Sequence, residues 1–199
     1  MYQDLVYPYI EGSTNTIPIP LIDIKRYLKL PTVTDADLDA DLTLMCHTAL
    51  EYAEKYTRQI FAERTITTNR VFWGEFRNGE VQNYFTLRRT PIKSVTSIKY
   101  DNDEVLPTTE YKVVNRRGNY DIINLTNAGN LPEIKNDWFP IEITYVAGYT
   151  AIPNDIKQAM LYHIASMWLN RGDYDNNLLK CPQMARDIYK KYKIIEIGS

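Results

Sequence analysis

The residue types that most often carry chemistry are few in this sequence and are not arranged as a catalytic site. Each of the two histidines, His47 and His163, lies in the middle of a helical pattern, and neither has partners at the spacing of a metal site. His47 follows Cys46, but neighbours on a helix point about 100° apart, so a Cys46–His47 dyad would need help from elsewhere in the fold. The eight glycines form no phosphate-binding loop motif. The sequence therefore predicts no enzyme, no cofactor and no metal.

The composition indicates one domain with its own core. The chain has 199 residues, 44% of them hydrophobic, and a net charge of -2, which argues against tight binding to the DNA backbone. No apolar run approaches the length of a membrane span, and the first residues do not resemble a signal peptide. Cys46 and Cys181 are far apart and are expected to be reduced thiols. The 16 tyrosines fit either an interface or a core with wet edges.

Helical spacing of apolar residues predicts helices near 21–28, 36–60, 153–171 and 182–191. Thr34 is the expected N-cap of the second helix, with Asp37 three residues on in a variant of the capping box. Its apolar stripe alternates steps of four and three residues and consists of Leu38, Leu42, Met45, Ala49, Tyr52 and Tyr56.

Between the second and third helices the apolar pattern changes to short alternating segments separated by turn residues. The expected fold class is therefore α+β: a small helical bundle with an antiparallel β-meander insertion near 65–147. Residues 1–20, rich in proline and small polar residues, are expected to form an irregular arm. Residues 21–192 should form a single domain, and 193–199 a C-terminal tail.

Three charged clusters are candidate interaction surfaces. The first is an acidic helix face, which is either solvated and matched to the helix dipole or a subunit interface, and comprises Asp35, Asp37, Asp39 and Asp41, with Arg58 at the far end. The second is the C-terminal segment, comprising Lys190, Lys191, Lys193, Ile194, Ile195 and Ile197. The third consists of two arginine pairs beside strands, Arg88, Arg89, Arg116 and Arg117. The simplest interpretation of both basic clusters is that their charges keep the surface soluble. The alternative is that they contact an acidic partner or DNA.

The order of these elements resembles the phage head–tail connector (adaptor) family, in its longer form with a β insertion. The stretches that carry the resemblance are 21–30, 49–61, 87–100 and 141–172. The last contains Ile141-Glu142-Ile143-Thr144-Tyr145-Val146-Ala147-Gly148-Tyr149, followed by Ile152-Pro153 and a helix ending at Asn170-Arg171-Gly172. None is a catalytic motif, and their order and spacing make the match specific.

The resemblance implies a virion structural protein of the phage neck, made in the host cytoplasm. Such adaptors form a ring of about a dozen copies with head-to-tail contacts. The ring docks beneath the portal protein, leaves a channel for DNA and offers a platform to a tail stopper or other tail protein. By this resemblance the acidic face would meet a neighbouring subunit and the C-terminal segment the portal. The arginine pairs would meet passing DNA or the tail protein, and no membrane is involved.

Two other classes of function remain open at this point. The chain could be a non-viral protein-binding module that uses the β-meander loops, or an enzyme with a cryptic site at Cys46 and His47 or at an aspartate. The size of the protein in solution separates the first from a ring, and substitution of Cys46 and His47 tests the second.

Overall fold

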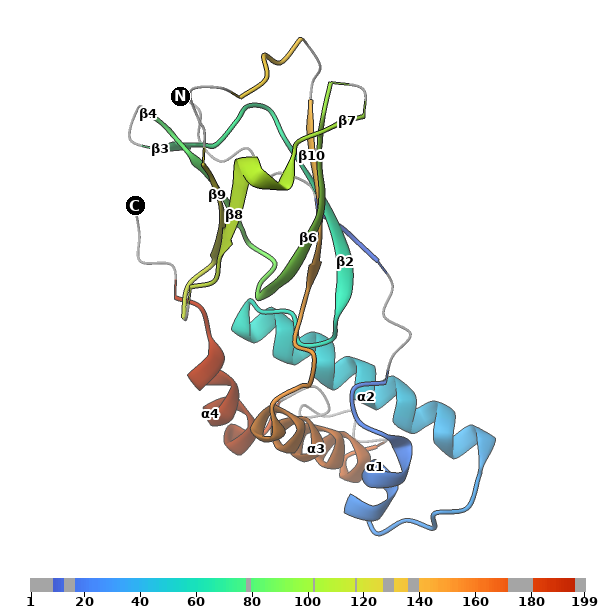
Figure 1. Ribbon diagram of the computed structural model, residues 1–199. Coiled ribbons are helices and arrows are strands. Elements are labelled where there is room, and N and C mark those ends of the chain that lie inside the picture. The colour runs from blue at the N-terminus through green and yellow to red at the C-terminus, as the bar shows by residue number, and fades with distance from the viewer. Residues whose placement is uncertain are drawn as a thin grey trace. The chain divides into compact units, whose positions relative to one another are not determined.

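The chain folds into a helical unit and a β unit (Figure 1). The computed structural model describes residues 9–12, 17–77, 80–101, 103–116, 118–126, 131–135, 140–171 and 181–195. The helical unit comprises Thr14–Ala62 and Tyr149–Ile195, and the β unit comprises Met1–Ser13, Glu63–Gly148 and Glu196–Ser199. The two units correspond to the helical bundle and the β insertion that the sequence predicts.

The described part of the helical unit contains the four predicted helices. They are α1 (Leu21–Tyr27), α2 (Ala36–Thr57), α3 (Asn154–Leu169) and α4 (Gln183–Tyr192). The apolar stripes of α2, α3 and α4 form one core because each is buried against the others. Its fully buried members include Leu42, Cys46, Ala49, Ala53, Ile156, Ala159, Met160, Ile164, Ala185 and Tyr189.

The start of α2 differs by one residue from the prediction of Thr34 as its N-cap. Asp35 is the N-cap, and its Oδ1 accepts a hydrogen bond from the backbone N–H of Leu38 at 3.2 Å. Both residue types cap helices well, and Asp adds a negative charge that favours the N-terminal end of the helix dipole. The prediction of a capping residue at the start of α2 is confirmed, and the predicted position of that residue is wrong by one.

The end of α2 connects the helix to the β unit. The helix ends at Thr57 rather than near residue 60, because Arg58 adopts the left-handed conformation with φ of 61°. The Glu54 carboxylate then accepts hydrogen bonds from the backbone N–H groups of Phe61, at 2.8 Å, and Ala62, at 3.2 Å. Ala62 forms a parallel bridge with Tyr149. The chain therefore leaves the helical unit and re-enters it at neighbouring positions.

The β unit is built from short antiparallel strands. The strands are β1 (Tyr9–Glu11), β2 (Arg64–Arg70), β3 (Glu75–Arg77), β4 (Glu80–Gln82), β5 (Tyr84–Leu87), β6 (Ile92–Tyr100), β7 (Glu104–Val105), β8 (Tyr111–Val114), β9 (Asp121–Leu125) and β10 (Ile141–Ala147), with a 3₁₀ turn at Thr108–Glu110. They form a five-stranded sheet in the order β1-β2-β10-β6-β7, a β3-β4 hairpin and a three-stranded sheet in the order β5-β9-β8.

The strand order corrects the prediction of a meander. In a meander each strand pairs with the next along the chain, whereas β10, the last strand, lies between β2 and β6. Alternation of buried and exposed residues shows which face of a strand is buried, but not which strand lies beside it. The structure also places Tyr9–Glu11 in a strand paired with β2, where the sequence predicts an irregular arm.

Two buried residues show how tightly the β unit is assembled. Arg70 on β2 is buried, and its guanidinium donates to the carbonyl of Thr86 on β5 at 3.0 Å, which ties the large sheet to the small one. Gly74 has φ of +93°, and a Cβ at this position would lie 1.9 Å from the carbonyl oxygen of Gln82 on β4. Only glycine allows the backbone to approach β4 this closely.

Candidate interaction surfaces

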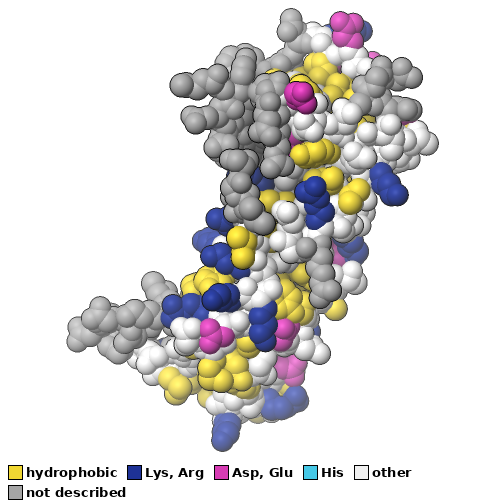
Figure 2. Space-filling model, turned by 90° about the vertical axis from the view of Figure 1, so that its left-hand side faces the viewer, with side chains coloured by type: hydrophobic (Ala, Val, Ile, Leu, Met, Phe, Trp, Pro, Cys, Tyr) yellow, Lys and Arg dark blue, Asp and Glu magenta, His cyan; other side chains and the backbone are white. Residues whose placement is uncertain are grey.

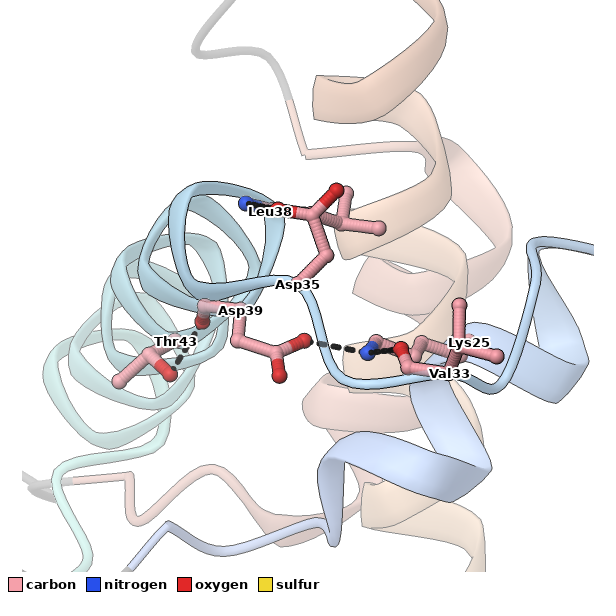
Figure 3. Close-up of polar contacts among 6 residues, drawn as sticks. All are labelled: Lys25, Val33, Asp35, Leu38, Asp39 and Thr43. Atoms are coloured by element: carbon pink, nitrogen blue, oxygen red, sulfur yellow. Dashed lines mark hydrogen bonds and ion pairs between the residues drawn. The ribbon is translucent and has the colours of Figure 1, made fainter.

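Two of the four aspartates predicted to form the acidic interface have structural partners within the chain. Lys25 of α1 is only 3% exposed. Its Nζ donates to the Val33 carbonyl at 2.7 Å and pairs with Asp39 Oδ1 at 2.5 Å, as Figure 3 shows. Asp35 caps α2 through the N–H of Leu38 (Figure 3). Asp35 and Asp39 therefore stabilise the corner between α1 and α2.

The outer α2 face, which we define as Asp37, Asp41 and Leu44, points away from the core. At 100° per residue these three positions fall within about 60° of one another around the helix. The two carboxylates are exposed, and Leu44 is 68% exposed although it is a large aliphatic residue. The hypothesis of a subunit interface on α2 therefore rests on these residues, with the exposed Arg58 at the other end of the helix.

The C-terminal segment is attached to the helical unit as far as Ile194. Ile194 is 1% exposed, and its backbone N–H donates to the carbonyl of Thr57 at 2.9 Å. The carbonyl of Tyr192 accepts a hydrogen bond from the Gln59 side chain. The Tyr192 hydroxyl donates to Asp155 Oδ1 at 2.7 Å, and desolvation, followed by this hydrogen bond, raises the pKa of Tyr192 to about 12. Ile194 is thus a core residue of the unit.

The side chains around this attachment are basic and apolar. Lys190 and Lys191 are exposed on α4, and the ammonium of Lys193 lies 5.2 Å from the centre of the Tyr56 ring. Ile195 is 69% exposed, and Ile197 lies outside the described residues. Figure 2 looks onto the side of the molecule that carries α4, where Lys and Arg side chains lie among hydrophobic ones.

One buried carboxylate joins the loop that carries Arg88 and Arg89 to the loop that carries Arg116. Asp121, the first residue of β9, is 2% exposed. Its Oδ2 accepts hydrogen bonds from the Thr90 hydroxyl and the Ile92 N–H, each at 2.7 Å, and from the Asn115 amide at 3.2 Å. Its Oδ1 accepts from the N–H of Arg116 at 2.7 Å. The carboxylate therefore joins the loop before β6 to the loop before β9.

This junction places Arg88 and Arg89 close in the fold to Arg116, although they are far apart in sequence. Arg88 and Arg116 are exposed and Arg89 is half-buried, while Arg117 lies outside the described residues. Because a shared carboxylate holds both loops, the arginines are carried on a fixed platform and not on independent loops. The sequence predicted two separate pairs, and the structure brings the loops of Arg88, Arg89 and Arg116 to one junction, which we call the arginine platform.

Both cysteines and His163 are buried, and His47 is half-buried on α2. Cys46 is fully buried, and burial raises the pKa of its thiol to about 11, so it stays protonated and is a poor nucleophile. His163 packs edge-on against Tyr52, with ring centres 5.0 Å apart, and burial lowers its pKa. Cys46 and Cys181 are both free. In the described ranges, no three His, Cys, Asp or Glu residues gather as a metal site.

Most tyrosines of the helical unit pack against one another inside it. Tyr52 stacks on Tyr56 at 6.0 Å and lies 6.1 Å from Tyr189, measured between ring centres. Of the tyrosine side chains that the structure describes, only Tyr27 is exposed. The tyrosine content thus agrees better with a core whose outer tyrosines are partly exposed to solvent than with a surface of exposed rings. No described helix is long and apolar enough to span a bilayer.

Comparison with solved structures shows where else this fold occurs. Three solved structures share the fold along nearly the whole chain. The first is a chain in the neck of an empty gene transfer agent (GTA) particle, with 19% sequence identity and a TM-score of 0.74; the match covers 95% of this chain and 97% of that one. The second is a chain in the virion of a native GTA particle, with 18% identity and a TM-score of 0.76; the match covers 96% of this chain and 97% of that one. The third is a chain in the neck of a native GTA particle, with 18% identity and a TM-score of 0.69; the match covers 95% of this chain and 97% of that one.

The family follows from a match to the sequence itself. The family model described as "Head completion protein" matches residues 20–177. The chain belongs to the head completion protein family, and the resemblance drawn from 21–172 is confirmed. No curated protein matches the sequence.

Two structural residues, Lys25 and Asp121, were missed at the sequence level, although each had a signal. Lys25 stands four residues after Leu21 and three before Leu28, so it lies on the apolar side of its helix, where a lysine needs a partner. Asp121 begins an apolar strand directly after a turn, and an acid there is positioned to accept hydrogen bonds from loop N–H groups.

Proposed function

We propose that this chain is a structural subunit of the neck of a phage or phage-like particle. The observation that carries the proposal is the match to the head completion protein family over residues 20–177. The shared fold with chains in GTA necks supports it. In this role, copies of the chain form a ring of about a dozen beneath the portal, join it to the next tail protein and leave a channel for DNA.

The role proposed is one of assembly and not catalysis. The family name describes completion of a particle head, and the residues that could form a cryptic enzyme site do not suit it. That site would use Cys46 and His47, and the buried Cys46 thiol, whose pKa is raised to about 11, is a poor nucleophile.

Contact with the portal is assigned to the chain beyond Ile194. The hydrogen bond from Ile194 to Thr57 holds the chain on the helical unit as far as this residue. Ile195 is the first residue beyond it, and its side chain is exposed. A segment with β-branched residues that leaves from a fixed point can add to a sheet or groove of a partner. The sequence predicts Ile197 and the lysines from 190 to 193 as further portal contacts.

Truncation tests the portal contact. A chain that ends at Ile194 should keep its melting temperature and lose binding to purified portal rings, measured by co-sedimentation. A chain that ends at Tyr192 should also lose stability, because it lacks the buried Ile194 side chain. Ile195→Asp in the full chain should also weaken portal binding, and Val105→Asp, a substitution at an exposed residue of β7, is its matched control. Undiminished docking by the chain that ends at Ile194 would reject the assignment.

The arginine platform is assigned to passing DNA or to the tail protein. Thr90, which follows Arg88 and Arg89 in the chain, and the backbone N–H of Arg116 both donate to the Asp121 carboxylate, and guanidinium groups bind phosphates well. Replacing Arg88 and Arg116 by alanine should weaken non-specific binding of assembled rings to duplex DNA. It should also lower the salt dependence, measured by fluorescence anisotropy at several salt concentrations. An unchanged salt dependence would assign the platform to the tail protein instead.

A further inference from the structure

We propose that α4 of one copy packs antiparallel against the outer α2 face of a neighbouring copy, with Met184 beside Leu44 and Lys191 beside Asp37. This inference rests on the proposed function, which gives every subunit neighbours of its own kind. A closed ring of identical subunits requires two different side faces on each subunit. The structure offers such a pair of faces within the helical unit.

The outer α2 face is unusual for a helix face directed to solvent. Leu44 is a large aliphatic side chain that is more than half exposed, and it lies one turn beyond Asp41 and two turns beyond Asp37. Asp35 and Asp39 are occupied by the α2 cap and by Lys25. The outward-pointing acids therefore flank the exposed leucine on one side, which is the pattern of an apolar anchor with a charged rim.

The outer face of α4 has the opposite charge and its own exposed aliphatic residue. Met184 is 63% exposed, and Lys190 and Lys191 are exposed one to two turns further along. The carboxylate of Asp187, which lies between them, accepts a hydrogen bond from the Gln183 amide at 2.7 Å. Residues 181–195 hold four basic residues and one acid, a net charge of +3.

The two faces match in spacing as well as in charge. Asp37 and Leu44 are seven residues apart, as are Met184 and Lys191, and seven residues span about 10.5 Å of helix. If the two helices run antiparallel with Leu44 beside Met184, Asp37 comes beside Lys191. This arrangement also sets the positive N-terminal end of one helix dipole beside the negative C-terminal end of the other, which is favourable.

Only a second copy can bring these faces together. Leu44 and Met184 are both exposed within the same chain, so neither is covered by the other there. The sequence grouped Lys190 and Lys191 with the portal contact. We assign them instead to the neighbouring subunit, and leave the portal to the chain beyond Ile194. Self-assembly and portal docking then depend on different residues, which makes the assignment testable.

Cross-linking tests the contact directly. Leu44→Cys and Met184→Cys proteins are mixed under mild oxidation, and non-reducing electrophoresis measures disulfide-linked dimers. Cys46 and Cys181 are buried and both have pKa values raised to about 11, so they react slowly. The mixture should give at least several-fold more dimer than either protein alone. Val105→Cys, an exposed residue of the β unit, replaces Met184→Cys in the control mixture, and a yield equal to this control overturns the proposal.

Charge reversal tests the pairing. Asp37→Lys or Lys191→Asp alone should weaken self-association on the order of tenfold in sedimentation velocity, since each puts like charges together, and the two changes in one chain should restore it. Lys112→Asp, an exposed residue of β8, is the matched control. If Lys191→Asp self-associates normally but no longer binds portal rings, the interface inference is overturned and the proposed function stands. The proposed function itself fails only if the wild-type chain does not bind portal rings.

Discussion

Replacing Asp121 by alanine should destabilise the β unit more than any surface substitution. The carboxylate accepts hydrogen bonds from four groups, among them the backbone N–H groups of Ile92 and Arg116, each at 2.7 Å. Alanine can accept none of them, and β6 and the loop before β9 would each lose an anchor. The side chain is almost fully buried, so water does not simply take its place.

The size of the effect follows from the groups left without a partner. A buried donor that loses its acceptor costs about 1–3 kcal/mol. Four such donors lie around Asp121, but the Arg116 side of the junction is close to solvent and can be rehydrated. We therefore expect a net loss of ~3 kcal/mol, which corresponds to an increase of ~100-fold in the unfolding equilibrium constant.

Hydrogen exchange measures this loss at the junction itself. In Asp121→Ala, the amide protons of Ile92 and Arg116 should exchange ~100-fold faster under conditions where exchange follows the opening equilibrium. Asp103→Ala is the control, because Asp103 lies in an exposed turn where its pKa is lowered by the Lys99 ammonium. If these two amides stay as protected in Asp121→Ala as in the wild type, the carboxylate is not their acceptor and the platform is held in another way.

Three further predictions concern single residues. Lys25→Met should lower the free energy of unfolding by ~2 kcal/mol in urea titration, because it leaves Asp39 without its cation. Adding Asp39→Leu should restore much of the loss, and a wild-type midpoint for Lys25→Met alone would refute the role of this ion pair. Gly74→Ala should cost ~2 kcal/mol or more in thermal unfolding, because of the positive φ and the clash with the Gln82 carbonyl. Burial lowers the pKa of His163, so the unfolded chain binds a proton near pH 6.5 that the folded chain does not, and stability should fall as pH drops below about 6.5. His163→Phe should flatten that dependence, and an unchanged slope would contradict the reasoning.

Residues whose environment is set by their nearest neighbours along the chain were predictable. The four helices follow from apolar spacing, and the strand segments from short alternating runs between turns. The resemblance across 21–172 carried the family, which the match over 20–177 confirms. For these features, local preference and tertiary packing agree.

Features that depend on a distant partner were not predictable in the same way. The position of β10 between β2 and β6 depends on which strands meet across the sheet, and a single sequence does not encode this as a local pattern. The ion pair of the buried Lys25 with the half-buried Asp39 appeared in the sequence as two charges belonging to different helices. The arginine platform depends on Asp121, whose hydrogen-bond partners Thr90 and Ile92 lie 31 and 29 residues before it in the chain. In each case the deciding contact joins segments far apart in the chain.

The bridge between Ala62 and Tyr149 has a consequence for how such proteins change over evolution. The Tyr149 N–H donates to the Phe61 carbonyl at 3.3 Å, and the two aromatic rings stack with centres 5.6 Å apart. The gene segment that encodes 63–148 therefore begins and ends at two points that touch in the protein. Recombination can lengthen, shorten or exchange that segment without shifting the register of any helix, as is usual for inserted domains whose ends lie close together. A lineage can thus vary residues 63–148 while the helical unit is inherited unchanged, provided that the new segment still offers a strand with which β1 can pair.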